Sequence, residues 1–299
     1  MSILVVGSVA LDSLKTPFGK RDEALGGSAT FFSMAASFFN KVNIVATVGK
    51  DFPKRHIDLL RKKGIGTEGL YVADGKTFRW KGWYGYDLNT AHTTYTHLNV
   101  FKDFRPQVPE DLKSSEYVFL ANIDPDLQLS VLKQVKRPKL IACDSMNYWI
   151  QTKKKSLMRL LKHVDLFLLN DGEARQLTGE ANLLKAARRV LSYGPKAVVV
   201  KKGEHGVIYF SRSAHFISPA YLLEDVRDPT GAGDTFAGGM IGYLSTVKRI
   251  DNQAICRGIV YGSILASFTV EGFSVDRLAE ISMGDIRRRY ENFKKITRF

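Results

Sequence analysis

Short apolar runs alternate with helical patterns along most of the chain. Such runs, bounded by polar and turn residues, predict buried strands, and they cover residues 3–6, 43–48, 70–73, 117–121, 140–143, 165–169 and 196–201. Helical patterns fall between and after them, at residues 28–36, 53–63, 125–135, 153–162, 181–192, 252–270 and 274–296. Strands that alternate with helices predict right-handed crossovers and a mainly parallel sheet. The pattern therefore indicates the α/β class.

Residues 76–104 break this rhythm. Residues 76–84 alternate imperfectly between aromatic and basic or small side chains, and a second β-type run, 91–101, follows a polar turn. The pattern predicts a β-hairpin that projects from the main sheet. Because a bare strand edge invites pairing, we expect the hairpin to close over a substrate or to meet a second subunit. Packing of its aromatic residues under a loop is the alternative. The polar residues 13–21 predict a loop or a short edge element.

Composition places the chain among ordinary globular proteins, with 44% hydrophobic and 25% charged residues in 299. The apolar run at residues 3–6 is too short for a secretory signal, and we expect no stretch that is long and apolar enough to span a membrane. Cys143 and Cys256 lie in apolar contexts and indicate neither a disulfide framework nor a metal cluster. A cytoplasmic location is the resulting prediction.

The formal net charge of +14 allows two interpretations. A basic surface attracts anionic substrates such as nucleotides, or it binds nucleic acid. The basic runs at 153–155, 287–289 and 294–295 fall in predicted helices or the tail, which indicates a solvated face. No recognised nucleic-acid-binding module accompanies the charge, so nucleic-acid binding is the less favoured alternative.

Polar residues follow three of the predicted strands, at Asn122–Asp124, Asp144–Asn147 and Asn170–Glu173. In open α/β sheets, ligands bind in the crevice beyond the carboxyl ends of the strands. We therefore expect a binding cleft where these residues gather.

The strongest chemical signal is a glycine turn before an apolar helix. Gly231 and Gly233 flank Ala232, and glycine allows positive φ and close approach of a ligand to the backbone. The three amides would be unpaired at the helix start, where the helix dipole also favours an anion. Asp234 could then accept the proton of an attacking hydroxyl while the amides stabilise a transferred phosphoryl group. Helix capping by Asp234 is the alternative. The glycines at 238–239 indicate that another element packs closely there, since each costs about 1 kcal/mol in a helix.

The sequence from Asp228 to Gly239, Asp-Pro-Thr-Gly-Ala-Gly-Asp-Thr-Phe-Ala-Gly-Gly, resembles the C-terminal signature of the ribokinase-like (PfkB) carbohydrate kinases. The resemblance implies a ribokinase-like three-layer α/β/α fold with a mainly parallel central sheet and a small β lid. Residues 12–21 and 76–104 would form the lid, and residues 1–11, 22–75 and 105–299 the main nucleotide- and substrate-binding domain. It implies ATP-dependent transfer of the γ-phosphoryl group to a hydroxyl, with Mg²⁺, and it allows an effect of a monovalent cation such as K⁺.

The same resemblance assigns substrate contacts near the N-terminus. Asp12 matches a family acid that binds substrate hydroxyls, although an ordinary turn acid is the alternative. Gly26 and Gly27 resemble the family's N-terminal glycine pair, which lets a substrate lie against bare backbone; a packed helix start would also explain them. Many sugar kinases of the family carry Asn where this chain has Phe31, so a polar contact to the substrate is missing or replaced.

Asn170 and Glu173 have the family's Asn-x-x-Glu spacing, which implies a role in organising Mg²⁺ and phosphate. The acid would hold metal-bound water, because Mg²⁺ prefers oxygen ligands and keeps several waters. Capping of a helix by Asn170 is an equal competitor.

The remaining assignments concern the nucleotide. The Gly-x-x-Gly after the strand at 196–201 resembles the family's turn along the ATP phosphates and ribose, and a plain hairpin turn is the alternative. No P-loop or protein-kinase motif set is present. The residues assigned to nucleotide binding are Lys201, Gly203, Gly206, Thr230, Gly231 and Gly233.

The acceptor stays open at this level. A sugar or sugar acid is the default, a polyol of the inositol type is possible, and a nucleoside such as adenosine is the close alternative. The nucleoside is suggested by aromatic residues that could stack on a base or on a sugar face, namely Trp80, Trp83, Tyr84 and Phe31. Lids of this family often form dimer contacts, which implies a homodimer. A nucleic-acid-binding or regulatory protein on a kinase fold is the non-enzymatic alternative, supported only by the charge.

Overall fold

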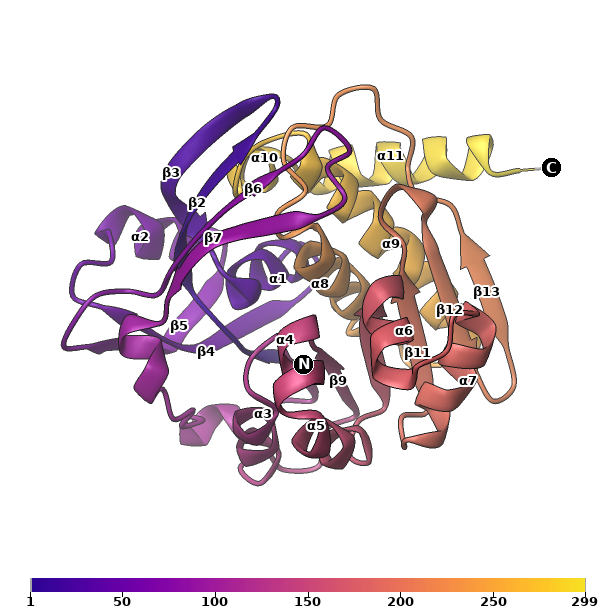
Figure 1. The fold of residues 1–299 in the computed structure, drawn as a ribbon, viewed down its shortest axis with the longest axis horizontal. Helices are drawn as coiled ribbons and strands as arrows, with labels where there is room; N and C mark the ends of the chain where they lie inside the picture. Colours follow the sequence, from indigo (N-terminus) through magenta and orange to yellow (C-terminus); the bar gives the residue numbers. More distant parts are fainter. Residues whose placement is uncertain (1, 299) are drawn as a thin grey trace.

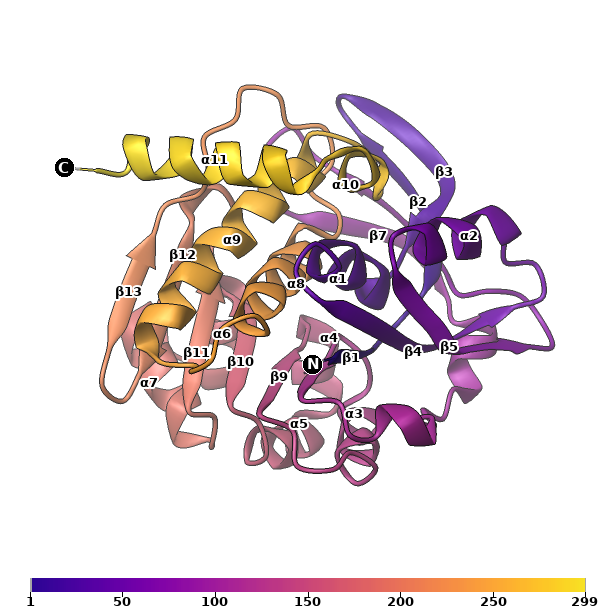
Figure 2. The same ribbon diagram turned by 180° about the vertical axis from the view of Figure 1, so that it is seen from behind.

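A computed structural model describes residues 2–298 and contains a nine-stranded sheet with helices on both faces (Figures 1 and 2). The strand order is β13-β12-β11-β10-β9-β8-β1-β4-β5, and β12 and β13 are antiparallel to their neighbours while the others run parallel. The strands are β1 Ser2–Val6, β4 Lys41–Gly49, β5 Ile65–Ala73, β8 Tyr117–Leu120, β9 Leu140–Asp144, β10 Leu166–Asn170, β11 Ala197–Lys201, β12 Val207–Ser211 and β13 His215–Ser218.

The sheet is buried on both faces because its strands are apolar throughout rather than alternating. In β1, Ile3 and Val5 belong to the hydrophobic core on one face and Leu4 and Val6 to the core on the other. Helices α1, α8 and α9 cover the first face, and α3 to α7 cover the second (Figures 1 and 2). The helices are α1 Ser28–Ala36, α2 Lys54–Lys62, α3 Pro125–Leu132, α4 Asn147–Thr152, α5 Lys154–Leu161, α6 Asp171–Thr178, α7 Leu183–Ser192, α8 Ala232–Leu244, α9 Asn252–Val270, α10 Asp276–Glu280 and α11 Met283–Ile296; short 3₁₀ turns are η1 Asn99–Asp103, η2 Glu110–Leu112 and η3 Gly203–His205.

A second, four-stranded sheet has the order β3-β2-β6-β7 and extends from the main body toward α8 (Figure 1). Its strands are β2 Ala10–Thr16, β3 Gly19–Gly26, β6 Arg79–Tyr84 and β7 Ala91–His97. The hairpin expected within 76–104 is present as β6 and β7. Residues 13–21, expected as a loop or a short edge element, instead belong largely to the β2–β3 hairpin, because β2 pairs with both β3 and β6. We call these four strands the lid sheet; closure of that sheet over a substrate stays a prediction.

Helix α9 contradicts the expectation that no stretch of the chain is long and apolar enough to span a membrane. Among the described residues it is the one helix that is long and apolar enough to cross a membrane, with a mean hydropathy of 1.2. However, 56% of that apolar stretch is buried in the protein, and α9 packs against α8 and α11. Burial against neighbouring helices therefore accounts for its composition.

The glycines at 238–239 lie where α8 packs against α1 and α9. Close packing was expected here, because glycine destabilises a helix and is retained where another element comes close. A Cβ at Gly238 would lie 2.2 Å from the carbonyl oxygen of Phe32 in α1, and one at Gly239 would lie 2.8 Å from the side chain of Leu265 in α9. These close contacts fix the position of α8 and hence of the turn that precedes it.

Candidate active site

The turn before α8 has the conformation that its glycine predicted. Gly231 is the N-cap of α8 with φ of 75°, the left-handed region that favours glycine. Asp228, which is 1% exposed, accepts a hydrogen bond from the amide of Thr230 at 2.9 Å and one from the amide of Ser274 at 3.4 Å. The buried Asp228 carboxylate thus holds the turn in place through these two hydrogen bonds. The sequence analysis did not assign this role to Asp228.

The amides of this turn differ from the expectation at one position. The amide of Ala232 donates to the carbonyl of Pro229 at 3.1 Å, so it closes the turn and is not free for an anion. Within residues 2–298, the amides of Gly231, Gly233 and Asp234 have no hydrogen-bond acceptor. The expectation that the Ala232 amide is unpaired was therefore wrong. The amide of Asp234 is unpaired instead, because a helix start leaves the first amides without partners, and binding of an anion by these amides stays a prediction.

Asp234 is half-buried, and its carboxylate makes no hydrogen bond to any residue in 2–298. The capping alternative is therefore not what the structure contains. Burial, together with the negative charge of Asp144, raises the pKa of Asp234 to about 7, although the Lys201 ammonium acts in the opposite direction. A carboxylate that titrates near neutral pH suits a general base.

Asp12 lies on β2 and its carboxylate rests on the start of α1. Its Oδ2 accepts a hydrogen bond from the amide of Gly27 at 3.3 Å. A Cβ on Gly26 would lie 1.9 Å from the same oxygen, and one on Gly27 would lie 2.5 Å from the carbonyl oxygen of Ser8. The glycine pair thus lets Asp12 and the backbone meet, and contact of these glycines with a substrate stays a prediction. Burial, with smaller effects of nearby acids, raises the pKa of Asp12 to about 7.

Phe31 and Tyr84 meet the turn from two sides. The Phe31 side chain is 2% exposed, and its ring would lie 2.3 Å from a Cβ on Gly231, so the ring packs directly against the turn. Tyr84, from β6 of the lid sheet, accepts a hydrogen bond from the hydroxyl of Thr230 at 3.3 Å. Burial raises the pKa of Tyr84 to about 12. Tyr84 therefore links the lid sheet to the turn, a contact that the sequence left open.

Asn170 and Glu173 form a capping box at the start of α6. The Asn170 side chain accepts from the amide of Glu173 at 2.7 Å, and Glu173 accepts from the amide of Asn170 at 2.8 Å. Burial and the charge of Asp144 raise the pKa of Glu173 to about 7. In the described part of the chain, no group of three or more His, Cys, Asp or Glu could hold a metal by itself. The capping alternative is thus present, and a role toward Mg²⁺ stays a prediction.

The turn between β11 and β12 contains the assigned Gly-x-x-Gly. Gly203 is exposed, with φ of 56°, and faces Asn89 of the β6–β7 connection. Gly206 has φ of 84°, and a Cβ there would lie 2.1 Å from the carbonyl oxygen of Ser218, so this glycine is required for packing. Lys201, at the end of β11, forms an ion pair of 2.7 Å with Asp144 at the end of β9. From the sequence, Asp144 is only one of several polar residues at a strand end.

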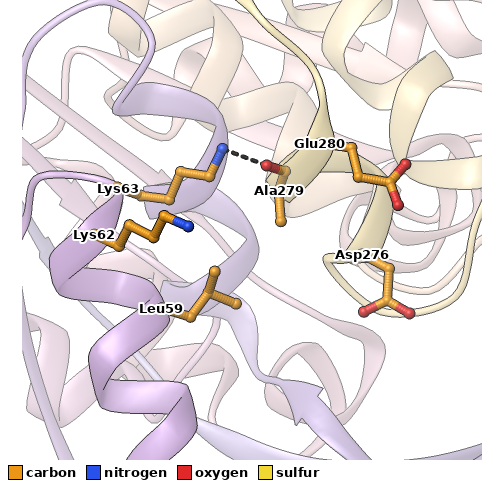
Figure 3. Close-up of a pocket in the computed structure, with 6 residues that line it drawn as sticks. All are labelled: Leu59, Lys62, Lys63, Asp276, Ala279 and Glu280. Atoms are coloured by element: carbon orange, nitrogen blue, oxygen red, sulfur yellow. Dashed lines mark hydrogen bonds between the residues drawn. The ribbon is translucent and has the colours of Figure 1, made fainter.

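Two surface hollows lie away from these residues. One, of about 440 Å³, separates α2 from α10, where Lys63 donates a hydrogen bond to the Ala279 carbonyl at 2.5 Å and Asp276 and Glu280 line the opposite side (Figure 3). The other, of about 590 Å³, is lined mainly by basic and aromatic residues of α9 to α11. None of the residues assigned from the sequence lines either hollow.

Comparison with known proteins identifies the family and the fold of the chain. Residues 9–277 match the pfkB family of carbohydrate kinases. The chain is 29% identical over 255 residues to the cytidine kinase of Thermococcus kodakarensis, which covers 84% of this chain and 91% of that protein. It is 25% identical over 229 residues to the nucleoside kinase of Methanocaldococcus jannaschii, covering 76% and 72%. An E. coli protein provisionally assigned as ribokinase II, solved with ATP and Mg²⁺, has the same fold, with a TM-score of 0.79, 19% identity and coverage of 97% and 99%.

Proposed function

Because this chain belongs to the pfkB family of carbohydrate kinases and is a phosphotransferase with a hydroxyl acceptor, we propose that the residues around Asp234 transfer the γ-phosphoryl group of ATP to a hydroxyl of a nucleoside. The observation that carries this proposal is the turn itself. Three unpaired amides lie at the start of α8, beside a carboxylate whose pKa is about 7. The reaction requires amides that bind the charge of the transferred phosphoryl group, and it requires a base that accepts the proton of the attacking hydroxyl.

The proposed reaction divides the work among these groups. The hydroxyl oxygen of the acceptor bonds to the γ-phosphorus, and the bond between the γ-phosphorus and the oxygen of the β-phosphate breaks. The Asp234 carboxylate accepts the proton of the attacking hydroxyl. The amides of Gly231, Gly233 and Asp234 donate to the oxygens of the transferred group. Lys201, Gly203, Gly206 and Thr230 stay assigned to the nucleotide. Positioning and electrostatic stabilisation account for most of the rate.

The oxygen atoms that the side chains of the site offer are suited to a Mg²⁺ ion whose main ligands are phosphates and water. The side chains at this edge of the sheet offer carboxylate oxygens, from Glu173 and its neighbours, and Lys201 is the cation whose charge acts on them. Glu173, oriented by Asn170, would hold metal-bound water, and the ion would supply positive charge that neutralises the phosphates. A K⁺ requirement stays an open prediction of the family resemblance.

The nucleoside is favoured over a simple sugar by the aromatic residues of the lid sheet. Phe31 is 2% exposed and packs against the turn, so it offers no ring face to a base and is not one of these residues. The lid sheet brings Tyr84 against Thr230 and carries the half-buried Trp80 on the same strand, which supplies aromatic surface for a base. The cytidine kinase and nucleoside kinase relatives support this choice.

The direct test is a screen for ADP release with ATP and Mg²⁺ over nucleosides, sugars and polyols. We expect nucleosides, with cytidine among them, to give the highest kcat/KM. Turnover of a free sugar or inositol, with none of any nucleoside, would replace the acceptor and leave the kinase assignment in place. Salt-sensitive retention on nucleic acid without phosphorylation of any alcohol would favour the regulatory alternative.

Asp12 is proposed to bind hydroxyls of the acceptor. Asp12→Asn is expected to raise the KM for the nucleoside about tenfold or more, because a site built to hydrogen-bond a hydroxyl loses most when that contact fails. The KM for ATP should not change. Steady-state kinetics with each substrate varied measures both values, and Asp22→Asn, an exposed acid on β3, is the matched control. Equal increases in both KM values would contradict the assignment.

We further propose a cytoplasmic location and a homodimer formed through the lid sheet. The free thiols of Cys143 and Cys256 support the first. Exposed aromatic residues on the lid sheet and the β6–β7 connection, Trp83 at 44% and Tyr86 at 85%, support the second.

A further inference from the structure

An ion pair crosses the carboxyl ends of three neighbouring strands. Asp144 ends β9 and Lys201 ends β11, with β10 between them in the sheet. The Lys201 Nζ donates to Asp144 Oδ2 at 2.7 Å, while Asp144 Oδ1 accepts from the amide of Ser145 at 2.8 Å. The Asp144 side chain is 5% exposed and that of Lys201 16%. Two hydrogen bonds and deep burial therefore fix the Asp144 carboxylate, and it in turn fixes the ammonium group.

The ammonium group lies directly beside the anion-binding turn. A Cβ placed on Gly233 would lie 3.1 Å from Lys201 Nζ, so the ammonium group lies in close contact with the turn at Gly233. A lysine ammonium has three N–H donors, and within residues 2–298 only Asp144 accepts one of them. Two donors of a largely buried cation are thus left beside the free amide of Gly233.

The surroundings keep this lysine charged. Burial lowers the pKa of Lys201, but the charges of Asp144, Glu173 and Asp234 outweigh that effect, and the pKa ends above its usual value. A cation so placed would also attract the oxygens of a phosphoryl group, because a charged donor in a water-poor site binds an anion more strongly than a neutral one.

We propose that Asp144 is a positioning residue that holds the Lys201 ammonium beside Gly233, where its two remaining N–H donors bind oxygens of the phosphoryl group being transferred. The inference rests on the proposed function, because it needs that group at the turn. In this proposal the Lys201 ammonium contacts the transferred phosphoryl group alongside the backbone amides. Asp144 does not contact that group and acts only by positioning Lys201.

The two residues predict a specific pattern of kinetic loss. Lys201→Met should lower kcat about 10²- to 10³-fold, the usual loss on removing one donor to a developing charge, with the acceptor KM little changed. Asp144→Asn should lower kcat less, by about tenfold. In the Lys201→Met background, Asp144→Asn should cost nothing further, because residues that act as a unit are not additive. Lys202→Met, the next residue, is the matched control and should keep wild-type kcat.

The pH profile separates positioning from a purely structural role. Lys201 lowers the pKa of Asp234 and Asp144 raises it, while Asp12, Glu173 and Tyr84 also face this group of charges. The acidic limb of kcat/KM should therefore move to higher pH in Lys201→Met and to lower pH in Asp144→Asn. A misfolded site would not move the limb in opposite directions. Additive losses, or limbs that move together, overturn the proposal.

Nucleotide binding gives a test that needs no acceptor. By calorimetry, Lys201→Met should reduce the preference for AMP-PNP over ADP about tenfold, because only the former carries a γ-phosphoryl group. The double variant Lys201→Met/Asp144→Asn removes both charges of the ion pair and should show the same loss if the single variant does not fold. An unchanged preference overturns this inference alone. Failure of the wild type to phosphorylate any nucleoside would instead refute the proposed acceptor.

Discussion

Replacing Asp234 by asparagine is expected to lower kcat by about 10²- to 10⁴-fold, the range that a positioned general base contributes. The amide of Asn cannot accept the proton of the attacking hydroxyl, yet it has nearly the same shape. Because the carboxylate of Asp234 makes no hydrogen bond to residues 2–298, its replacement should leave the turn and the helix in place. The affinity for ADP, measured by calorimetry, should therefore stay at the wild-type value.

The matched control for this variant is Asp171→Asn. Asp171 is also an acid in the first turn of a helix, α6, where it forms an ion pair with Arg175. If the only role of Asp234 were a favourable interaction of its charge with the helix dipole, the two variants would lose similar, small amounts of stability, and kcat would be unchanged in both. Turnover by Asp234→Asn within a few-fold of wild type would falsify the assignment of the base.

Gly231→Ala is expected to lower kcat about 10²-fold, because it displaces the amides that bind the developing charge. Two costs combine at this position. A residue with a Cβ loses roughly 1–2 kcal/mol in the left-handed region, and the new methyl group would lie 2.3 Å from the Phe31 ring, an overpacking that costs about 1–3 kcal/mol. Chemical denaturation and steady-state kinetics on the same preparation measure both effects.

Gly179→Ala separates the two costs of the Gly231 variant. Gly179 has φ of 74° at the end of α6, almost the same as Gly231, but a Cβ there would have no neighbour within 4 Å. We expect Gly179→Ala to lose only the conformational part of the stability, about 1–2 kcal/mol, and no kcat. Equal behaviour of the two variants would mean that the contact with Phe31 does not matter.

Much of the fold could be predicted because its signals are local. The apolar runs at 43–48 and 140–143 became β4 and β9, and the helix expected at 252–270 is α9. The glycines at 238–239 even indicated close helix packing, because their cost in a helix requires a reason. The β2–β3 hairpin was missed because most of β3 is solvent-exposed and its stability comes from pairing with β2, a contact that a polar sequence does not reveal.

The site was predicted less completely, for a topological reason. The turn at 231–234 follows from glycine conformation and helix termini, both properties of a short segment. The pair of Asp144 and Lys201 joins strands that are not adjacent in the sheet, so no spacing in the sequence could show it. The free amide of Asp234 in place of that of Ala232 depends on whether a turn closes with its own hydrogen bond, which residue types leave open.

The central claim is that Asp234, with a pKa of about 7, takes the proton of the acceptor hydroxyl. The most direct test is the single-turnover rate of nucleoside phosphorylation at saturating ATP and Mg²⁺, measured from pH 5.5 to 8.5 in the wild type and in Asp234→Asn. A protonated carboxyl cannot act as the base, so the wild-type rate should fall about tenfold per pH unit below the pKa and level off above it. The variant should be slow and nearly independent of pH. If Asp234→Asn keeps the wild-type rate or the wild-type acidic limb, another group is the base and the account is contradicted.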